Sequence, residues 1–407
     1  MRIPPLLSVL LAVTVLALGG CAGFVERPAV PPVTPSPALV KVEAPPDLTD
    51  DLDLPSLLRA LDESLAYYRE RGDKRVFCLP EVCYTGEEMA SGLRLFKEIM
   101  TSPASEEERR RAIRQRFDFY RAAGRDGRGE VIFTGYFEPI LAGSLERTER
   151  FRYPLYGVPP ETVTVRLGLF NPKYGRERIT GRLAGREVVP HYSRREIDTG
   201  KALAGRGLEI AWTDDPVALF FLHIQGSGIL RLPDGSLLRV GYAGANGRPF
   251  RGLTGMMVQR GLLGENEKSY RRLKAYLEDN PATREELMNY NESYVFFRVV
   301  PEGPLGALGR VVVAHRSIAT DLDLFPPGAL ALVRLRKPLF DERGEIASWR
   351  PFSRFVLNHD AGGAIKGPGR VDLFCGTGPE GEMVAGSLNE RGELYFLVGK
   401  REGGEGS

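Results

Sequence analysis

From Gly124 onward the chain is a succession of short strand-type runs separated by turns rich in glycine and proline. The apolar and aromatic residues 131–137 form the first run, and residues 237–240 follow a turn at Asp234-Gly235. The composition agrees, because 47 glycines and 30 prolines among 407 residues are typical of a turn-rich β protein. We therefore expect a mainly β fold with flanking helices (α+β), in a chain long enough for two domains.

Helical periodicity is confined to a few segments. Three amphipathic segments precede Gly124, and Ser105 with Glu108 gives the third a capping-box pattern. The inward face of this third helix is expected to carry Ile113, Phe117 and Tyr120. Two further helices are expected at residues 269–277 and 281–288, the second capped by Asn280, and strand-type runs at residues 152–165, 210–212, 217–224, 294–300, 311–315, 329–335 and 355–357.

The N-terminus predicts a processing signal in residues 1–20. Arg2 supplies a positive charge, residues 6–18 are apolar, and the sequence Leu18-Gly-Gly-Cys21 follows. This ending resembles a bacterial lipoprotein box, which implies cleavage before Cys21 and acylation of that residue. An ordinary signal peptide that happens to end near a cysteine is the alternative. By resemblance to Gram-negative sorting rules, Ala22 implies anchoring in the outer membrane, with the protein facing the periplasm.

The segments next to the predicted anchor and at the C-terminus are expected to lie outside the folded body. Residues 21–53 comprise the lipidated cysteine and a proline-rich tether, and residues 401–407 a disordered tail. No other apolar run approaches the length of a membrane span. Cys78 and Cys83 are close enough in sequence to form a disulfide in an oxidising compartment, whereas Cys375 is expected to be a small buried residue.

Charge and motif content exclude several functions. A net charge of +2 provides no strongly basic face for nucleic acid. The sequence has no phosphate loop, no dinucleotide fingerprint and no zinc-ligand spacing, so neither a cofactor nor a metal is expected. Its four histidines, His191, His223, His315 and His359, stand in no recognised triad signature and are expected to be structural.

The strongest candidate for chemistry lies in residues 358–376, where Asp360 and Asp372 are separated by a glycine-rich stretch. Val371, Leu373 and Phe374 surround Asp372, which predicts that this acid lies on a packed strand. A carboxyl group in apolar surroundings has a raised pKa, so Asp372 is a candidate general acid. Asp360, like Asp321 before a Pro-Pro-Gly turn, could equally be a second catalytic group or a turn cap.

Five segments combine small residues with aromatic, amide and hydroxyl side chains in strand-like surroundings. Such a combination is what a polar, uncharged ligand such as a glycan requires. Each segment alone is weak evidence for a binding site, because motifs such as Gly-Ser-Gly occur in many turns. The segments are Thr134-Gly-Tyr-Phe-Glu-Pro139, His223-Ile-Gln-Gly-Ser-Gly228, Gly241-Tyr-Ala-Gly-Ala-Asn-Gly247, Asn291-Glu-Ser-Tyr-Val-Phe-Phe297 and the stretch from Asp360 to Gly376.

In this order the five segments resemble the membrane-bound lytic murein transglycosylase A family, over roughly residues 54–400. The C-terminal part also resembles the three-aspartate domain, whose acids fall on Asp321, Asp360 and Asp372. The resemblance implies a double-psi β-barrel domain built from residues 54–139 and 240–400. A smaller β-barrel domain is inserted at residues 140–239, with a substrate groove between the two. Pro368-Gly-Arg370 lengthens the loop before Asp372 relative to some members.

The resemblance also implies an activity: a lyase that cuts peptidoglycan between N-acetylmuramic acid and N-acetylglucosamine without water and leaves 1,6-anhydro ends. Asp372 would be the single acid and base, with Asp360 and Asp321 as auxiliary acids. The partners implied are peptidoglycan strands, the membrane through Cys21, and unidentified proteins of cell-wall synthesis or division. The substrate-binding residues expected from the motifs are Thr134, Gly135, Tyr136, Gln225, Gly226, Ser227, Gly228, Tyr242, Asn246, Gly247, Gly363 and Lys366.

Two other functions stay open at this point. The first is an inverting glycoside hydrolase, with Asp372 as acid and Asp360 or Asp321 as the base that activates water. The second is a non-catalytic lipoprotein that binds peptidoglycan. Asp372 argues against the second, because a binding module gains nothing from a carboxyl group on an apolar strand.

Overall fold

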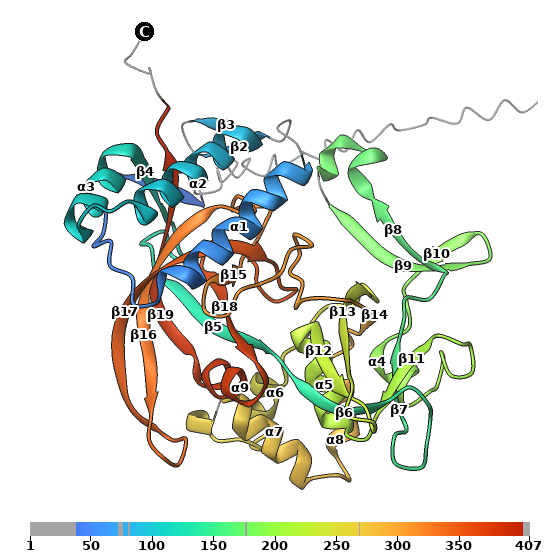
Figure 1. The fold of residues 1–407 in the computed structure, drawn as a ribbon. Coiled ribbons are helices and arrows are strands. Elements are labelled where there is room, and N and C mark those ends of the chain that lie inside the picture. The colour runs from blue at the N-terminus through green and yellow to red at the C-terminus, as the bar shows by residue number, and fades with distance from the viewer. Residues whose placement is uncertain (1–37, 72–75, 80–81, 176, 268, 402–407) are drawn as a thin grey trace, which may run out of the picture. The chain divides into compact units, whose positions relative to one another are not determined.

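The computed structural model describes residues 38–71, 76–79, 82–175, 177–267 and 269–401, so Cys21 and the predicted leader lie outside the described residues. Its strands form one sheet of eight strands, one of six, and smaller sheets of three and two strands (Figure 1). The expectation of a mainly β fold with flanking helices is confirmed. None of the helices within the described ranges combines the length and apolar character needed to cross a membrane.

The eight-stranded sheet closes on itself. Its order is β1-β4-β19-β16-β17-β15-β18-β5, and β5 also pairs with β19, so that six of the strands form a barrel consistent with the double-psi fold. Within this ring the pairs β15–β17 and β18–β5 are parallel. The strands are β1 (Leu39–Val42), β4 (Phe117–Ala122), β5 (Val131–Glu138), β15 (Ser317–Ala319), β16 (Leu330–Phe340), β17 (Ile346–Asp360), β18 (Arg370–Thr377) and β19 (Asn389–Gly399).

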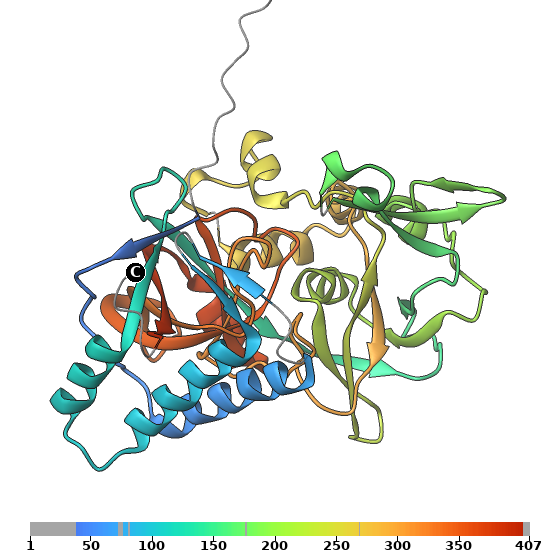
Figure 2. The same cartoon turned by 90° about the horizontal axis from the view of Figure 1, so that it is seen from above.

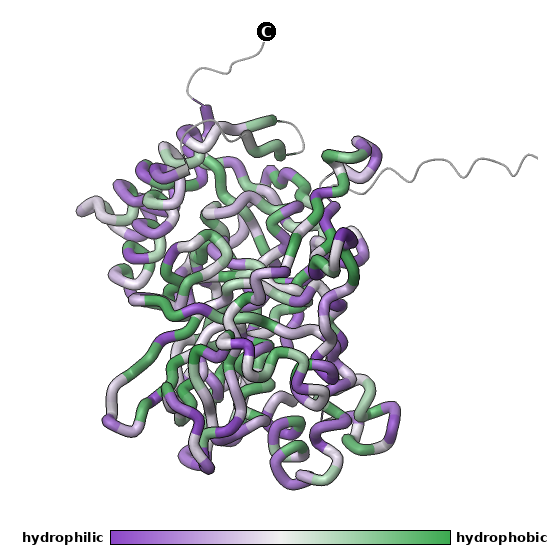
Figure 3. Tube along the Cα trace, turned by 90° about the vertical axis from the view of Figure 1, so that its right-hand side faces the viewer, coloured by the Kyte–Doolittle hydropathy of each residue, from purple (hydrophilic) through white to green (hydrophobic). Residues whose placement is uncertain are grey.

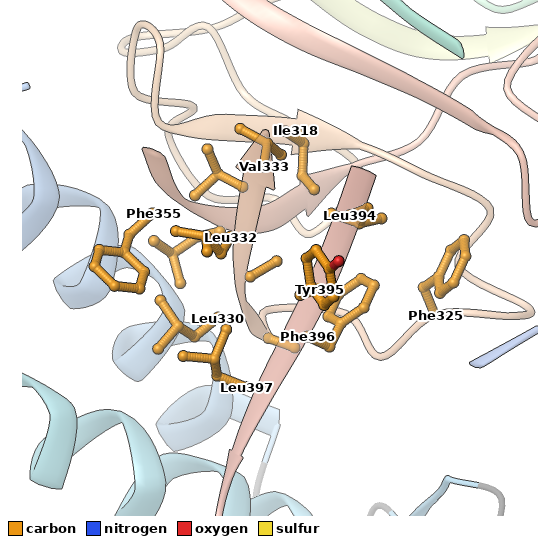
Figure 4. Packing of buried hydrophobic residues seen from close by; sticks show 14 of the residues in the cluster. Ile318, Phe325, Leu330, Leu332, Val333, Phe355, Leu394, Tyr395, Phe396 and Leu397 are labelled. Atoms are coloured by element: carbon orange, nitrogen blue, oxygen red, sulfur yellow. The ribbon is translucent and has the colours of Figure 1, made fainter. Parts of the chain in front are cut away.

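The barrel and its helices bury one continuous apolar cluster. Leu330 and Leu332 of β16, Phe355 of β17 and Phe396 of β19 belong to it (Figure 4). Helices α1 (Leu54–Arg71) and α2 (Gly86–Thr101) pack on β17 and β19, and the Phe96 ring of α2 meets that of Phe355 edge-on at 4.9 Å between centroids. The helices therefore cover strands that would otherwise expose apolar side chains.

The six-stranded sheet has the order β14-β13-β12-β6-β11-β7, and its outer strands β7 and β14 also contact each other (Figure 2). Its core includes Leu219 and Leu222 of α5 (Pro216–Gln225), which pack with Leu230 and Val240. The expected end of the insert at residue 239 stays a prediction, although β13 spans that position and β14 follows it. The strands are β6 (Ile140–Ser144), β7 (Tyr153–Tyr156), β11 (Glu209–Thr213), β12 (Ser227–Arg231), β13 (Leu237–Ala245) and β14 (Val295–Val299).

The remaining elements are short. Figure 3 shows apolar and polar residues alternating in brief stretches along the chain, as expected for strands with one buried face. The elements are α3 (Glu106–Arg116), α4 (Arg194–Asp198), α6 (Leu253–Gln259), α7 (Tyr270–Asp279), α8 (Arg284–Asn289), α9 (Gly378–Ser387), β2 (Val76–Cys78), β3 (Cys83–Thr85), β8 (Thr162–Arg166), β9 (Arg178–Ala184), β10 (Glu187–Val189) and the 3₁₀ turns η1 (Leu167–Leu169), η2 (Pro172–Tyr174) and η3 (Glu265–Glu267).

Local signals at two sites are confirmed. Ser105 and Glu108 form the predicted capping box at the start of α3, each bonding to the other's backbone N–H. Cys78 and Cys83, whose pairing the sequence left open, form a disulfide between β2 and β3. Cys375 is buried and free, as expected.

The strand expected at residues 217–224 is wrong, because this run forms helix α5. Asp215 caps it by accepting hydrogen bonds from the N–H groups of Val217 and Ala218, and Pro216 occupies its first turn. Gly226 ends the helix in the left-handed conformation, with φ 81°. A helix buried on nearly all sides has a continuous apolar sequence, which periodicity alone cannot distinguish from a buried strand.

Three other element assignments are also corrected. Phe117 and Tyr120 belong to β4 and not to the third helix, since the aromatic run pairs with β19. Residues 311–315 form no regular strand and contribute a single bridge through Val311. Helix α8 begins at Arg284 instead of Pro281, because residues 281–283 form a turn in which Asn280 accepts from Thr283.

The segment before α1 packs on the barrel, whereas the sequence predicted a tether as far as residue 53. Strand β1 pairs with β4, and Leu48 is buried. Arg316, fully buried at the start of β15, donates to Asp50 Oδ2 at 2.6 Å. Arg354 on β17 donates to both carboxylate oxygens of Asp51, at 2.8 and 3.0 Å. These ion pairs fix residues 50–51 because an unpaired buried arginine is costly.

Candidate active site

Asp372 lies on β18 beside β5, as the apolar sequence around it predicted. The parallel register places Thr134 of β5 opposite Asp372, and the Thr134 hydroxyl donates a hydrogen bond to Asp372 Oδ1. Arg370 donates in turn to the Thr134 hydroxyl, at 3.1 Å. Burial raises the pKa of Asp372, while the Thr134 hydrogen bond and the Arg370 charge oppose that rise. The residue is nevertheless partly exposed, so a ligand can reach it.

Asp360 lies at the end of β17, where the backbone and a tyrosine hold its carboxyl group. Its Oδ1 accepts from the N–H groups of Ala307 and Ala361, at 2.7 and 2.8 Å, and its Oδ2 accepts from the Tyr136 hydroxyl at 2.8 Å. Burial raises the pKa of Asp360 to about 6 against the effect of these three donors, and the charge of Asp372 adds to the rise. Asp360 therefore titrates close to neutrality.

A single residue of β15 pairs with both acids through the backbone. Ala319 pairs with Asp360 on the parallel neighbour β17 and with Asp372 on the antiparallel neighbour β18. Adjacent strands are about 4.8 Å apart, so the two backbones are separated by roughly 10 Å. The barrel thus brings together two of the three predicted acids on strands that flank one three-residue strand.

The third predicted acid, Asp321, holds the glycine-rich loop. Its Oδ2 accepts from the N–H of Gly367 at 3.0 Å, and its Oδ1 lies 3.5 Å from the Lys366 ammonium group. The Lys366 side chain is mostly exposed and Gly363 has open space beside it. These contacts make Asp321 an anchor of the loop, as the turn-capping alternative predicts, and its role as an auxiliary acid stays a prediction.

The Thr134-Gly-Tyr segment lines the same strand junction. A side chain at Gly135 would lie 2.6 Å from the Ala385 backbone of α9 and 2.9 Å from the Cys375 sulfur, so only glycine fits there. The Tyr136 ring packs on that of Phe374, with centroids 5.2 Å apart. This packing directs the Tyr136 hydroxyl to Asp360.

The Gln-Gly-Ser-Gly segment joins α5 to this strand. Gln225, the last residue of α5, accepts a hydrogen bond through Oε1 from the N–H of Phe137, at 3.1 Å. Gly226 ends the helix, and Ser227 and Gly228 begin β12, both buried. The segment is thus next to β5 in space, although Gln225 and Phe137 are 88 positions apart in sequence.

The Tyr-Ala-Gly-Ala-Asn-Gly segment is divided between surface and interior. Tyr242 on β13 is 53% exposed. Asn246 is fully buried, donates to the carbonyls of Tyr192 and Glu292, and accepts from the N–H groups of Tyr294 and Arg248. Gly247 lies against the Thr180 backbone of β9. The geometry gives Asn246 a structural part in the second sheet, because its amide is fully used by backbone groups.

Sequence reasoning missed one buried carboxylate. Glu138, the last residue of β5, is fully buried, bonds to Arg239 of β13, and accepts from the Thr377 hydroxyl of β18 at 2.9 Å. It therefore links the barrel to the second sheet where the chain passes between them. The sequence does contain an indication of this carboxylate, because an acid directly follows the apolar and aromatic residues of the run at 131–137.

Three of the four histidines are buried, and His315 is partly exposed with a pKa that burial lowers to about 4. Both ring nitrogens of His359 are hydrogen-bonded, to the hydroxyls of Ser64 and Ser317 at 2.8 Å each, and burial lowers its pKa to about 3. His223 is buried, its Nδ1 accepts from the N–H of Val295, and burial lowers its pKa well below the usual value. Both imidazoles are thus neutral at physiological pH, which leaves the carboxyl groups as the proton donors of this site.

Two family models match the chain: "MltA specific insert domain" over residues 132–298 and "3D domain" over residues 316–398. Relatives include the membrane-bound lytic murein transglycosylase A of Escherichia coli (strain K12), 31% identical over 283 residues and 69% of each chain. The protein of the same name from Vibrio cholerae is 29% identical over 277 residues and 67% of each chain.

Solved structures are similar as well. A membrane-bound lytic murein transglycosylase from Agrobacterium tumefaciens has a TM-score of 0.70 and 29% identity, covering 85% of this chain and 93% of that one. MltA from Neisseria gonorrhoeae has a TM-score of 0.61 and 29% identity, covering 84% and 89%. E. coli MltA with bound chitohexaose shares the fold, with a TM-score of 0.68, 24% identity and coverage of 90% and 96%.

Fold and site together define a β-barrel protein of the 3D-domain class, with its acids at the junction of three barrel strands. The chain belongs to the membrane-bound lytic murein transglycosylase A family.

The pKa of Asp360 leads to a prediction about stability. A carboxyl group whose folded-state pKa is raised from 3.8 to about 6 destabilises the folded state as pH rises through that interval. Asp360→Asn removes this titration, so the variant should gain stability relative to the parent between pH 4 and pH 7. The gain should reach about 3 kcal/mol near pH 7, at about 1.4 kcal/mol per pKa unit. Urea unfolding at several pH values measures it.

Asp323→Asn is the matched control, because Asp323 lies in an exposed position on a nearby loop. Its stability difference from the parent should be the same at each pH. A difference for Asp360→Asn that also stayed constant from pH 4 to pH 7 would contradict the raised pKa.

Proposed function

We propose that this chain cleaves the β-1,4 bond between N-acetylmuramic acid and N-acetylglucosamine in peptidoglycan without water, and that it leaves a 1,6-anhydro end. The family's members are lytic murein transglycosylases, and this chain is accordingly an enzyme that acts on peptidoglycan. The proposal that cleavage proceeds without water rests on the surroundings of the Asp372 carboxyl group. It is a partly exposed carboxyl group with a raised pKa on a barrel strand, paired with a hydroxyl donor.

In the first step, protonated Asp372 donates its proton to the glycosidic oxygen as the bond from that oxygen to C1 of the muramyl residue breaks. The raised pKa favours the protonated form that this step needs. The departing sugar leaves an oxocarbenium-like centre, and the new carboxylate stabilises its positive charge. Thr134 and Arg370 then support the ionised form of Asp372, because a hydroxyl donor and a nearby cation both favour a carboxylate.

In the second step, ionised Asp372 accepts the proton of the muramyl C6 hydroxyl while that oxygen bonds to C1. The acid recovers its proton, the ring closes and no water is consumed. The nucleophile belongs to the same sugar, so proximity replaces the second carboxylate that a hydrolase needs. The three hydrogen bonds that Asp360 accepts agree with a supporting role, since they occupy both of its oxygens.

An inverting hydrolase is the second candidate, and one observation favours it. The two acids flank a single strand, and backbones roughly 10 Å apart can place carboxyl groups within the roughly 6.5–9.5 Å that an inverting mechanism needs. A pKa of about 6 would also suit Asp360 as a general base. The names of the relatives argue against a purely binding function for this chain.

The predicted substrate-binding residues divide into two groups in this proposal. Tyr136, Tyr242 and Lys366 are wholly or partly exposed and would contact the glycan or its peptide stems. Gly363 leaves the backbone of the glycine-rich loop open to a close approach. Of the others, Ser227, Gly228 and Asn246 are buried and would shape the surface from behind, whereas Thr134 holds Asp372. Gly135, Gln225, Gly226 and Gly247 are partly or wholly exposed. The groove itself we place between the barrel and the insert domain.

Replacement of Asp372 by asparagine tests the assignment of the acid. The amide cannot donate and recover a proton, so turnover of purified sacculi should fall by roughly 100- to 10,000-fold. Binding to sacculi should persist, because the side chain keeps its size. Release of soluble fragments measures turnover and co-sedimentation measures binding, with Asp323→Asn as the control. Turnover within a factor of two of the parent would refute the role of Asp372.

The ends of the released fragments decide between the two mechanisms. Mass spectrometry of digested peptidoglycan should find muropeptides with anhydro ends, which are lighter than hydrolysed products by the mass of one water. Digestion in water enriched in heavy oxygen should leave these ends unlabelled. Incorporation of heavy oxygen at C1 would establish the hydrolase and exclude the ring-closing step.

We also propose that Cys21 is acylated and holds the protein at the periplasmic face of the outer membrane. The sequence before Cys21 supports this, as does the name "membrane-bound" given to the relatives. A full-length Cys21→Ala variant should not be acylated, and metabolic labelling with a radioactive fatty acid should label the parent alone. Equal labelling of parent and variant would contradict the anchor.

A further inference from the structure

We propose that the end of the β8–β9 arm binds an anionic phospholipid surface directly, in addition to any anchor at Cys21. The arm is a separate three-stranded antiparallel sheet of β8, β9 and β10 (Figure 1). The connection from β8 to β9 contains the turns η1 and η2, and its described residues, 166–175 and 177–178, are named here the arm tip. None of these residues belongs to the candidate active site described above.

The arm tip exposes two large apolar side chains next to each other. Leu169 is 81% exposed and Phe170 is 78% exposed, the highest values among the large apolar residues that the structure describes. Ile179, Leu183 and Val188 extend the exposed apolar surface along the arm, at 52%, 48% and 46%. Scattered exposed leucines are ordinary, but several large apolar side chains exposed on one small sheet and its connecting turns indicate an interaction site.

The charges around these apolar side chains indicate which kind of surface would bind them. The described residues of the arm tip include three bases and one acid, Glu177. Arg166, Lys173 and Arg178 are all exposed, and none of the three forms an ion pair with another described residue. A leucine–phenylalanine pair with flanking cations is suited to the boundary of an anionic bilayer, where the apolar groups enter the acyl region and the bases remain with the phosphates.

A lipid surface fits this composition better than a glycan does. Sugars bind aromatic faces and hydrogen-bonding groups, whereas four of the six exposed large apolar residues on the arm are aliphatic, the other two being Phe170 and Tyr174. The seventeen residues from Ala22 to Ala38 span at most about 60 Å, so an acylated Cys21 would keep the arm close to the bilayer. Two weak membrane contacts on one chain reinforce each other.

The test uses the chain from Ala22 onward, which lacks Cys21 and cannot be acylated. Residues Pro37–Ser407 form one compact unit with its own core, so this chain should fold without the leader. Co-sedimentation with vesicles of phosphatidylethanolamine and phosphatidylglycerol should detect binding, and vesicles of phosphatidylcholine alone should bind at least tenfold more weakly. The absence of the anchor separates this result from any failure of the Cys21 proposal.

Two variants locate the contact. Leu169→Ser with Phe170→Ser should reduce binding to anionic vesicles by at least tenfold. Arg166→Gln with Lys173→Gln should reduce it by roughly fivefold per charge. The matched control is Leu145→Ser with Leu237→Ser, two leucines outside the arm that are 55% and 62% exposed, and it should bind as the parent does. All variants should release soluble fragments from sacculi at the parental rate, which also confirms that they fold.

Three results would overturn the proposal. The parent chain could fail to bind anionic vesicles. The serine variant could bind them as well as the control does. Finally, the serine variant could lose binding to purified sacculi by the same factor as binding to vesicles, which would make the cell wall the partner of the arm tip.

Discussion

The site depends on the three-residue strand β15, because its pairing on both sides sets the distance between the two acids. Ala319 pairs with Asp360 on one side and with Asp372 on the other, so the main chain and not a flexible side chain fixes their spacing. The closure of the barrel through β5 and β19 then keeps β18 beside β5. Without that closure Thr134 would not face Asp372, and the acid would lose its hydroxyl partner.

Both acids are held in surroundings that favour the protonated form, but their partners differ. Burial raises the pKa of each. Asp360 is tied by two backbone N–H groups and Tyr136, whereas Asp372 has only the Thr134 hydroxyl, backed by Arg370. A less constrained carboxyl group is better able to meet a ligand, which is consistent with the division of roles proposed above. The large apolar cluster of the barrel offsets what the buried acids cost in stability.

Much of the local structure follows from the sequence near each element. The capping box at Ser105, the turn at Asp234-Gly235 and the strand around Asp372 were predictable, because short-range backbone geometry and burial of apolar side chains decide them. Helix α5 was not predicted, although Asp215-Pro216 and Gly226 marked its ends. Its continuous apolar sequence reflects burial on nearly every side, and burial depends on the second sheet that packs around it.

The sequence by itself determined which residues could perform chemistry: a carboxyl group among apolar neighbours at position 372, two further acids, and a set of glycine and aromatic motifs. It also indicated their family, whose fold the structure has. Only the tertiary structure decided how they combine, namely that Asp360 and Asp372 share Ala319, that Asp321 holds a loop, and that Glu138 joins the two sheets. The reason is physical, since strand pairing and burial act between residues that are distant in the chain, and no local pattern records them.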